Sequence, residues 1–172
     1  MKRAIAIVFA LAMIGNCSPR QADRCDFSVT RTLAFTSADA EDRIVVRSFG
    51  VSCDKAIGVY EITDTEGRPI WAWAVPLHRA FGDVFSEDEH MQTFLDEWSQ
   101  PVLGATQAAP EWQALQPGQT TFDELTYRDI RARNLPMLCH FSGTARELCV
   151  FWEPIAGGAG HLFDRDVEEL EK

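Results

Sequence analysis

The first sixteen residues constrain this chain more than any other stretch, because they set the compartment in which the rest must fold. Lys2 and Arg3 precede an apolar run of about eleven residues, from Ala4 to Ile14. A membrane-spanning helix needs roughly 20 apolar residues, whereas the apolar core of a secretory signal peptide has about the length seen here. We therefore expect residues 1–16 to be a removed export signal, and the mature domain to fold where disulfides form.

A cysteine closes this leader. The residues from Leu11 to Cys17 read LAMIGNC, which resembles the lipobox of bacterial lipoproteins, although Asn16 stands where that family usually has Gly, Ala or Ser. The resemblance implies that Cys17 is lipidated and begins the mature chain, so that the membrane is a partner through this anchor. Ser18, rather than Asp, implies sorting to the periplasmic face of the outer membrane in a Gram-negative cell. The alternatives are a secreted protein cut nearby and a leader retained as an anchor.

The remaining chain has the size of one domain and is strongly acidic. Removal of the leader leaves 156 of the 172 residues, which we divide into a polar tether at 17–24, a single domain at 25–165 and an acidic tail at 166–172. The 16 Lys and Arg against 26 Asp and Glu give a net charge of −10, and loss of the two leader cations makes it −12. This charge argues against nucleic acid and anionic headgroups as partners, whereas a basic protein or a cell-wall partner would fit.

The cysteine count predicts two disulfides. With Cys17 carrying lipid, four cysteines remain, and an even number in an oxidising compartment allows two bonds with three connectivities. The two early cysteines flank one predicted hairpin and the two late ones flank another. We therefore predict the pairs Cys25–Cys53 and Cys139–Cys149.

The first predicted hairpin carries a candidate anion site. Residues 27–36 alternate between apolar and polar side chains, and residues 43–51 are rich in Val, Ile and Phe, so we expect two antiparallel strands. If Cys25 lies opposite Cys53, Arg31 faces Arg47 on an apolar face. Like charges in direct opposition are unfavourable. We expect the repulsion between Arg31 and Arg47 to be relieved by a carboxylate from one of the helices, or by snorkelling of the side chains to solvent. The alternative is a small anion that both arginines bind.

The rest of the chain predicts an α+β fold with one antiparallel sheet. A second hairpin at 56–62 and 70–77 has Trp71 and Trp73 on its return strand, which we interpret as core rather than a sugar-stacking platform. Capping boxes at 86–89 and 121–124 begin two amphipathic helices, with an irregular stretch between them. The remaining strands are expected at 137–141, 147–152 and 161–163. We expect about six strands in hairpins, with the two-helix insertion packing on one face.

The sequence shows no recognisable set of catalytic residues. The four histidines lack metal-binding spacing, and the chain has no phosphate loop or nucleophile elbow, so we predict no catalytic residue, metal or cofactor. The favoured hypothesis is a non-enzymatic envelope lipoprotein, an accessory, binding or inhibitory domain with an acidic surface. The alternative is a periplasmic hydrolase that uses His140 or His78 with nearby carboxylates.

Overall fold

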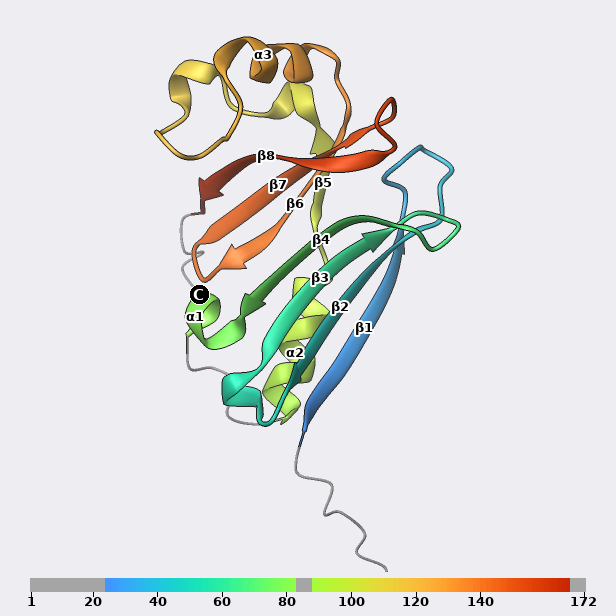
Figure 1. Ribbon diagram of the computed structural model, residues 1–172, viewed down its shortest axis with the longest axis vertical. Helices are drawn as coiled ribbons and strands as arrows, with labels where there is room; N and C mark the ends of the chain where they lie inside the picture. Colours follow the sequence, from blue (N-terminus) through green and yellow to red (C-terminus); the bar gives the residue numbers. More distant parts are fainter. Residues whose placement is uncertain (1–23, 83–87, 168–172) are drawn as a thin grey trace, which may run out of the picture.

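The computed structural model describes residues 24–82 and 88–167. They form two four-stranded antiparallel sheets, called here sheet A, with strand order β1-β2-β3-β4, and sheet B, with order β5-β6-β7-β8 (Figure 1). The strands of sheet A are β1 Cys25–Leu33, β2 Asp42–Gly50, β3 Ile57–Thr63 and β4 Pro69–Pro76. Those of sheet B are β5 Val102–Ala105, β6 Pro136–Gly143, β7 Arg146–Glu153 and β8 Gly158–Asp166. The helices are α1 Leu77–Phe81, α2 Asp88–Trp98 and α3 Glu124–Ala132, with short 3-10 turns η1 Cys53–Lys55, η2 Thr106–Ala108 and η3 Trp112–Ala114.

Several predicted features lie outside the described residues. These are the leader at 1–16, Cys17, most of the tether, the capping Ser86, and the end of the acidic tail from residue 168. None of the helices among the described residues has the length and apolar character that crossing a membrane requires.

The mixed fold with antiparallel strands is confirmed, and its details differ from the prediction. Eight strands form two sheets, where about six in one sheet were expected. The two longer helices do not share a face: α2 lies against β1 and β2, whereas α3 packs with η2 and η3 beside sheet B. The strand that sequence analysis missed is β5, which falls in the stretch predicted to be irregular.

Both predicted disulfides are confirmed, Cys25–Cys53 and Cys139–Cys149. The predicted register of the first hairpin is wrong, because Cys25 pairs with Gly50 rather than with Cys53. Strand β2 ends at Gly50, and the chain turns back through η1, where Cys53 is placed to reach Cys25. The disulfide therefore closes the end of the sheet and does not mark a cross-strand pair.

The second predicted hairpin is formed by β3 and β4, with a register shift between Ile62 and Thr63. Tyr60 lies opposite Trp73, and Ile62 lies opposite Trp71. This register puts both tryptophans on the inner face of sheet A, where they are partly buried against the main core. Their interpretation as core residues is supported.

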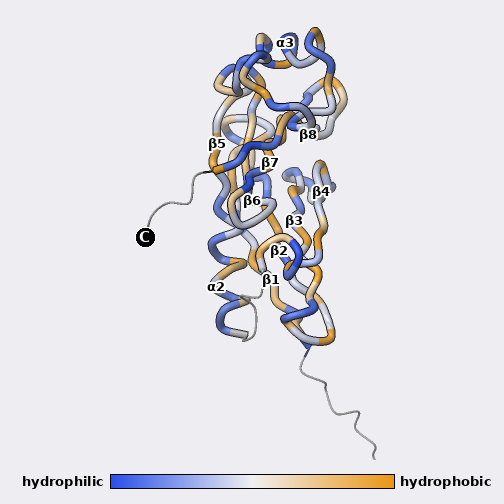
Figure 2. The backbone as a smooth tube through the Cα atoms, turned by 90° about the vertical axis from the view of Figure 1, so that its left-hand side faces the viewer, coloured by the Kyte–Doolittle hydropathy of each residue, from blue (hydrophilic) through white to orange (hydrophobic). Residues whose placement is uncertain are grey.

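The inner face of sheet A is divided between two covering layers. Helix α2 covers β1 and β2, while sheet B approaches the β4 side through β8. Figure 2 shows α2 on one side of sheet A, with sheet B above it. Trp98, at the end of α2, is buried where the layers meet, and its indole N–H donates to the Phe141 carbonyl of β6 at 2.8 Å. A second, smaller core lies between α3 and the other face of sheet B.

Candidate functional site

The structure separates the two arginines of the predicted anion site. Arg31 pairs with Ile44 and points to the inner face, where its guanidinium contacts Asp96 of α2 at 2.8 Å and the hydroxyl of Ser99, directly after α2, at 2.6 Å. Arg47 pairs with Ser28 on the outer, exposed face. The predicted opposition of Arg31 and Arg47 is wrong, and with it the alternative of a shared anion, whereas the expected helix carboxylate is present for Arg31 as Asp96.

A buried aromatic cluster surrounds His140 between the two sheets. The imidazole stacks on Tyr60, with ring centroids 4.0 Å apart, and also borders Trp73 and Trp98. His140 Nδ1 lies 2.9 Å from the Phe141 carbonyl, which can only accept, so Nδ1 carries the hydrogen and Nε2 keeps its lone pair. Burial lowers the pKa of His140 to about 4, and the imidazole is therefore neutral at pH 7.

Four buried polar atoms, two of them in this cluster, lack hydrogen-bond partners among the described residues. The Tyr60 hydroxyl, the Trp71 indole N–H, His140 Nε2 and His78 Nδ1 are all buried without a hydrogen bond. Burial also raises the pKa of Tyr60 above its ordinary value. Within the described ranges, no carboxylate hydrogen-bonds to either histidine of the predicted hydrolase site, so His140 and His78 are not supplied with an acid–base partner.

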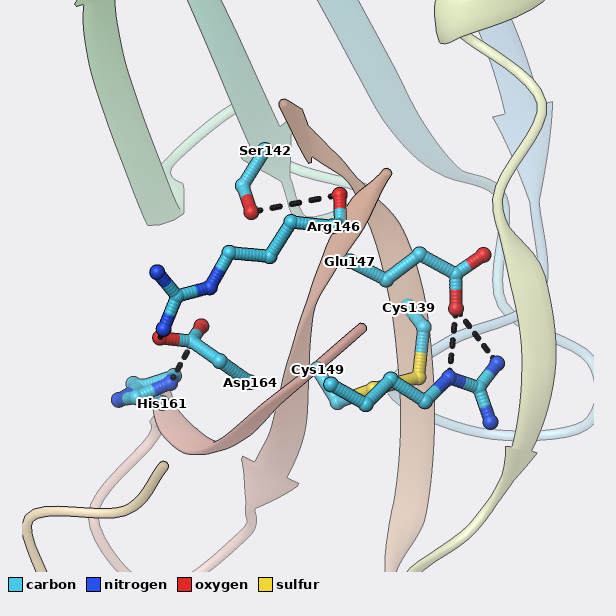
Figure 3. Close-up of a disulfide and its surroundings, with 8 residues drawn as sticks. Cys139, Ser142, Arg146, Glu147, Cys149, His161 and Asp164 are labelled. Carbon is cyan, nitrogen blue, oxygen red and sulfur yellow. Dashed lines mark hydrogen bonds and ion pairs between the residues drawn. A yellow bond between two sulfur atoms is a disulfide. The ribbon is translucent and has the colours of Figure 1, made fainter. Parts of the chain in front are cut away.

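A charged cluster of Arg146, His161 and Asp164 lies near the second disulfide, on the opposite face of strands β7 and β8 (Figure 3). Asp164 accepts from His161 Nε2 at 3.2 Å and from Arg146 at 3.1 Å. The nearby Ser142 hydroxyl lies 3.5 Å from the Arg146 carbonyl and is directed to it rather than to the imidazole. Ser142 is therefore not positioned as a nucleophile for the pair of His161 and Asp164. Among the described residues, no three His, Cys, Asp or Glu side chains are grouped to hold a metal ion.

Strand β5 presents an open edge of sheet B. It pairs with β6 alone, through Val102 opposite Cys139 and Leu103 opposite Leu138. Both side chains are more than half exposed, Val102 at 55% and Leu103 at 53%. Phe141 of β6, on the same face as Val102, is 41% exposed. This edge combines accessible backbone with accessible apolar side chains.

The hydrogen-bond pattern determines which β5 groups face outward. The Thr106 amide donates to the Leu135 carbonyl at 2.8 Å. Backbone groups in an antiparallel pair alternate in direction, so those of Val102 and Gly104 point to β6. The short Cys139–Cys149 Cα separation of 4.0 Å agrees, because the Cα atoms of a non-hydrogen-bonded pair, whose backbone groups point away from each other, lie closer than those of a hydrogen-bonded pair. Leu103 and Ala105 therefore direct their N–H and C=O groups to the open edge.

The other three sheet edges carry features that discourage pairing. Edge strand β4 has a proline at each end, Pro69 and Pro76. Edge strand β1 carries Asp26 and Arg31, and β8 is charged along its second half, at Asp164, Arg165 and Asp166. Proline and charge are the usual means of blocking edge-to-edge association. Strand β5, with the sequence VLGA, has neither, although Pro101 precedes it.

Comparison with protein-family models, curated proteins and solved structures finds no match to this chain. The candidate site therefore rests on its geometry alone. The β5 edge could not be predicted from the sequence. A four-residue strand is too short to show a periodic pattern, and the sequence does not give the order of strands in a sheet.

Proposed function

We propose that this protein is a lipid-anchored envelope lipoprotein whose folded domain is a non-enzymatic binding module. In this proposal a partner contributes an extended segment that pairs with β5 as a fifth strand of sheet B. The observation that carries the binding proposal is the β5 edge, with its exposed Val102 and Leu103 and its outward backbone groups. Strand addition of this kind draws affinity from main-chain hydrogen bonds and selectivity from alternate side chains.

The charge of the chain favours a basic segment as the partner. The net charge is −10, which attracts cationic surfaces and accelerates their association. Five residues before β5, Glu97 is exposed at the end of α2 and makes no ion pair with a described residue. We therefore propose an extended segment with apolar residues at alternate positions and Lys or Arg beside them.

The anchor is supported by the cysteine count. The chain has five cysteines, and two disulfides occupy four of them. The fifth is Cys17, at the end of the short apolar leader. Metabolic labelling with a palmitate analogue tests the anchor: we expect label and membrane fractionation in the wild type, and loss of both in Cys17→Ser. An unlabelled wild type, or label retained in Cys17→Ser, would overturn the anchor.

Site-specific photo-crosslinking tests the edge. A photoreactive amino acid at Val102, in the full chain expressed in its own host, is expected to give a defined adduct with a partner protein. The same group at Thr30, which is exposed on edge strand β1, is the control and is expected to give none.

A proline substitution makes this experiment specific for strand pairing. Leu103→Pro removes an N–H that points outward and that sheet B does not use, so we expect the fold to persist while pairing fails. Leu103→Ala keeps the N–H and serves as the matched variant. We expect the Val102 adduct to disappear in Leu103→Pro and to remain in Leu103→Ala. An adduct that is indifferent to the proline, or the absence of any adduct in the wild type, counts against the proposal.

A further inference from the structure

The outer face of sheet A ends in an apolar patch close to the start of β1. Phe49 of β2, Ile57 of β3 and Pro76 of β4 lie side by side in one row across three strands. Val51 follows directly after β2. Phe49 is 49% exposed and Val51 is 74% exposed, so the patch is open to whatever lies against this end of the sheet.

Three cations without ion pairs to described residues lie at this end of sheet A. Arg47 adjoins it on β2, Arg24 immediately precedes β1, and Lys55 follows the disulfide partner of Cys25. None of the three makes an ion pair with a described residue, whereas most arginines elsewhere do. Those in ion pairs are Arg31, Arg68, Arg128, Arg131, Arg133, Arg146 and Arg165. The patch is therefore a place where positive charge is left available.

Carboxylates also lie at this end of sheet A. Asp26 lies opposite Phe49, and Asp54 lies in η1. These two carboxylates stand beside the three cations, and Glu61 lies on the same outer face one pair beyond Arg47, opposite Val45, in a chain whose net charge is −10. The overall charge argues against attraction of the whole molecule to an anionic surface, but the three cations at this end make no ion pair with a described residue. Apolar side chains flanked by cations are the composition that binds at a lipid headgroup boundary.

The position of the patch limits what can cover it. Eight residue steps separate Cys17 from Cys25, and a chain can span at most about 3.5 Å per step, or about 28 Å in total. Phe49 lies opposite Asp26, one residue further along. A lipid attached at Cys17 therefore holds this end of sheet A within a short distance of the bilayer, where even a weak contact is favoured by high effective concentration.

We propose that this end of sheet A is a membrane-docking face. Phe49 and Val51 enter the headgroup boundary, and Arg24, Arg47 and Lys55 contact lipid phosphates. The inference rests on the proposed lipid anchor and adds a second, non-covalent contact to it. Docking in this way fixes the orientation of the domain and leaves sheet B, with its β5 edge, available to a partner.

The test uses the full lipidated chain in proteoliposomes of phosphatidylethanolamine and phosphatidylglycerol that contain a photoactivatable lipid. We expect lipid adducts to concentrate in the peptides that contain Phe49, Val51 and Lys55. In Phe49→Ser/Val51→Ser we expect labelling there to fall to the level of sheet B peptides. Ile155→Ser is the matched control, since Ile155 is 89% exposed in the turn between β7 and β8 of sheet B and is expected to change nothing.

The outcomes separate the docking face from the anchor. If the protein sediments with the liposomes but labelling is uniform, or is unchanged in Phe49→Ser/Val51→Ser, docking is overturned and the anchor stands. If the wild type carries no lipid and does not sediment with the liposomes, the anchor itself fails. Replacing Arg24, Arg47 and Lys55 with Gln is expected to reduce labelling most in vesicles rich in phosphatidylglycerol. A partner that displaces lipid from this patch would identify a protein-binding surface and would also overturn the proposal.

Discussion

Sheets A and B have the same number of strands, one disulfide each and one long helix each, but they are buried differently. Sheet A has one covered face and one open face, so its strands alternate: in β2, Ile44 and Val46 are fully buried while Arg43 and Arg47 are exposed. Sheet B is covered on both faces over its central strands, and the five consecutive residues 147–151 of β7 are all buried. Strands covered on both faces lose the period-two pattern.

The two disulfides reflect the same difference. Cys139 and Cys149 are a directly opposed pair within sheet B, whereas Cys25–Cys53 links a strand to the turn beyond its neighbour. Double coverage also explains the polar residues buried in sheet B. Glu147 is neutralised by Arg165, and the imidazole of His140 stays neutral against Tyr60. A sheet with two covered faces has no exposed side for such residues.

The largest loss of stability is expected from a substitution at the junction of the two sheets. Trp98 is 2% exposed and contacts aromatic rings from sheet A, α1 and α2. Trp98→Ala is expected to lower the free energy of unfolding by about 4 kcal/mol, because it opens a large cavity and removes the hydrogen bond to Phe141. Trp112→Ala, in the partly exposed margin of the second core, is the comparison and should cost less than half as much. Urea denaturation measures both, and equal losses would mean that the junction is not the principal core.

The next largest losses of stability are expected from removal of the two disulfides, one at a time. The Cys25–Cys53 bond spans 28 residues and the Cys139–Cys149 bond spans 10. Loop-closure entropy predicts losses of about 3.6 and about 2.7 kcal/mol when each pair is replaced by alanines. Denaturant midpoints of the two double variants test this order. A greater loss for Cys139→Ala/Cys149→Ala would show that the cross-strand clamp matters more than the length of the loop.

The smallest expected effect is a pH dependence of stability that arises from His140, at the interface between the sheets. The pKa of His140 is about 4 when folded, against an ordinary 6.5. The unfolded chain therefore binds more protons between these values, and stability is lost as pH falls from 6.5 towards 4. The expected loss is about 1.8 kcal/mol between pH 7 and pH 5. Melting temperatures of the wild type and His140→Phe across this range are the measurement.

The matched variant for this prediction is His90→Gln, because His90 is exposed on α2. We expect His90→Gln to keep the wild-type pH dependence between pH 6.5 and 4, and His140→Phe to lose most of it while retaining the stacking on Tyr60. Parallel pH profiles for the wild type and His140→Phe would assign the titration to another group.

The same contrast explains what could be predicted from the sequence. The hairpin of β6 and β7 was predictable, because Cys139 and Cys149 lie within strands and at equal distances from a short turn. The register of β1 and β2 was not, because nothing marks Cys53 as lying beyond the end of its strand. The positions of Met91, Leu95 and Trp98 predicted α2 well, since helical periodicity is local.

The candidate surfaces depend on information that is not local. The open β5 edge follows from the order of strands in sheet B, and the apolar patch of sheet A follows from residues on three strands meeting in one row. Phe49 and Ile57 look like core residues in the sequence. The exposure of Phe49 and the incomplete burial of Ile57 result from the parity of the β2 register, which also carried Arg47 away from Arg31.

The arrangement of the two sheets has a consequence for the order in which the chain is made. Sheet A is complete once Pro76 has been synthesised, but Leu138 and Leu148, which pack into its core, follow more than 60 residues later. Until then Tyr60, Trp71 and Trp73 lack the layer that buries them. A nascent or stalled chain thus leaves these aromatic side chains less covered than in the finished fold, and a fragment truncated before β6 lacks the residues of β6 and β7 that complete this core.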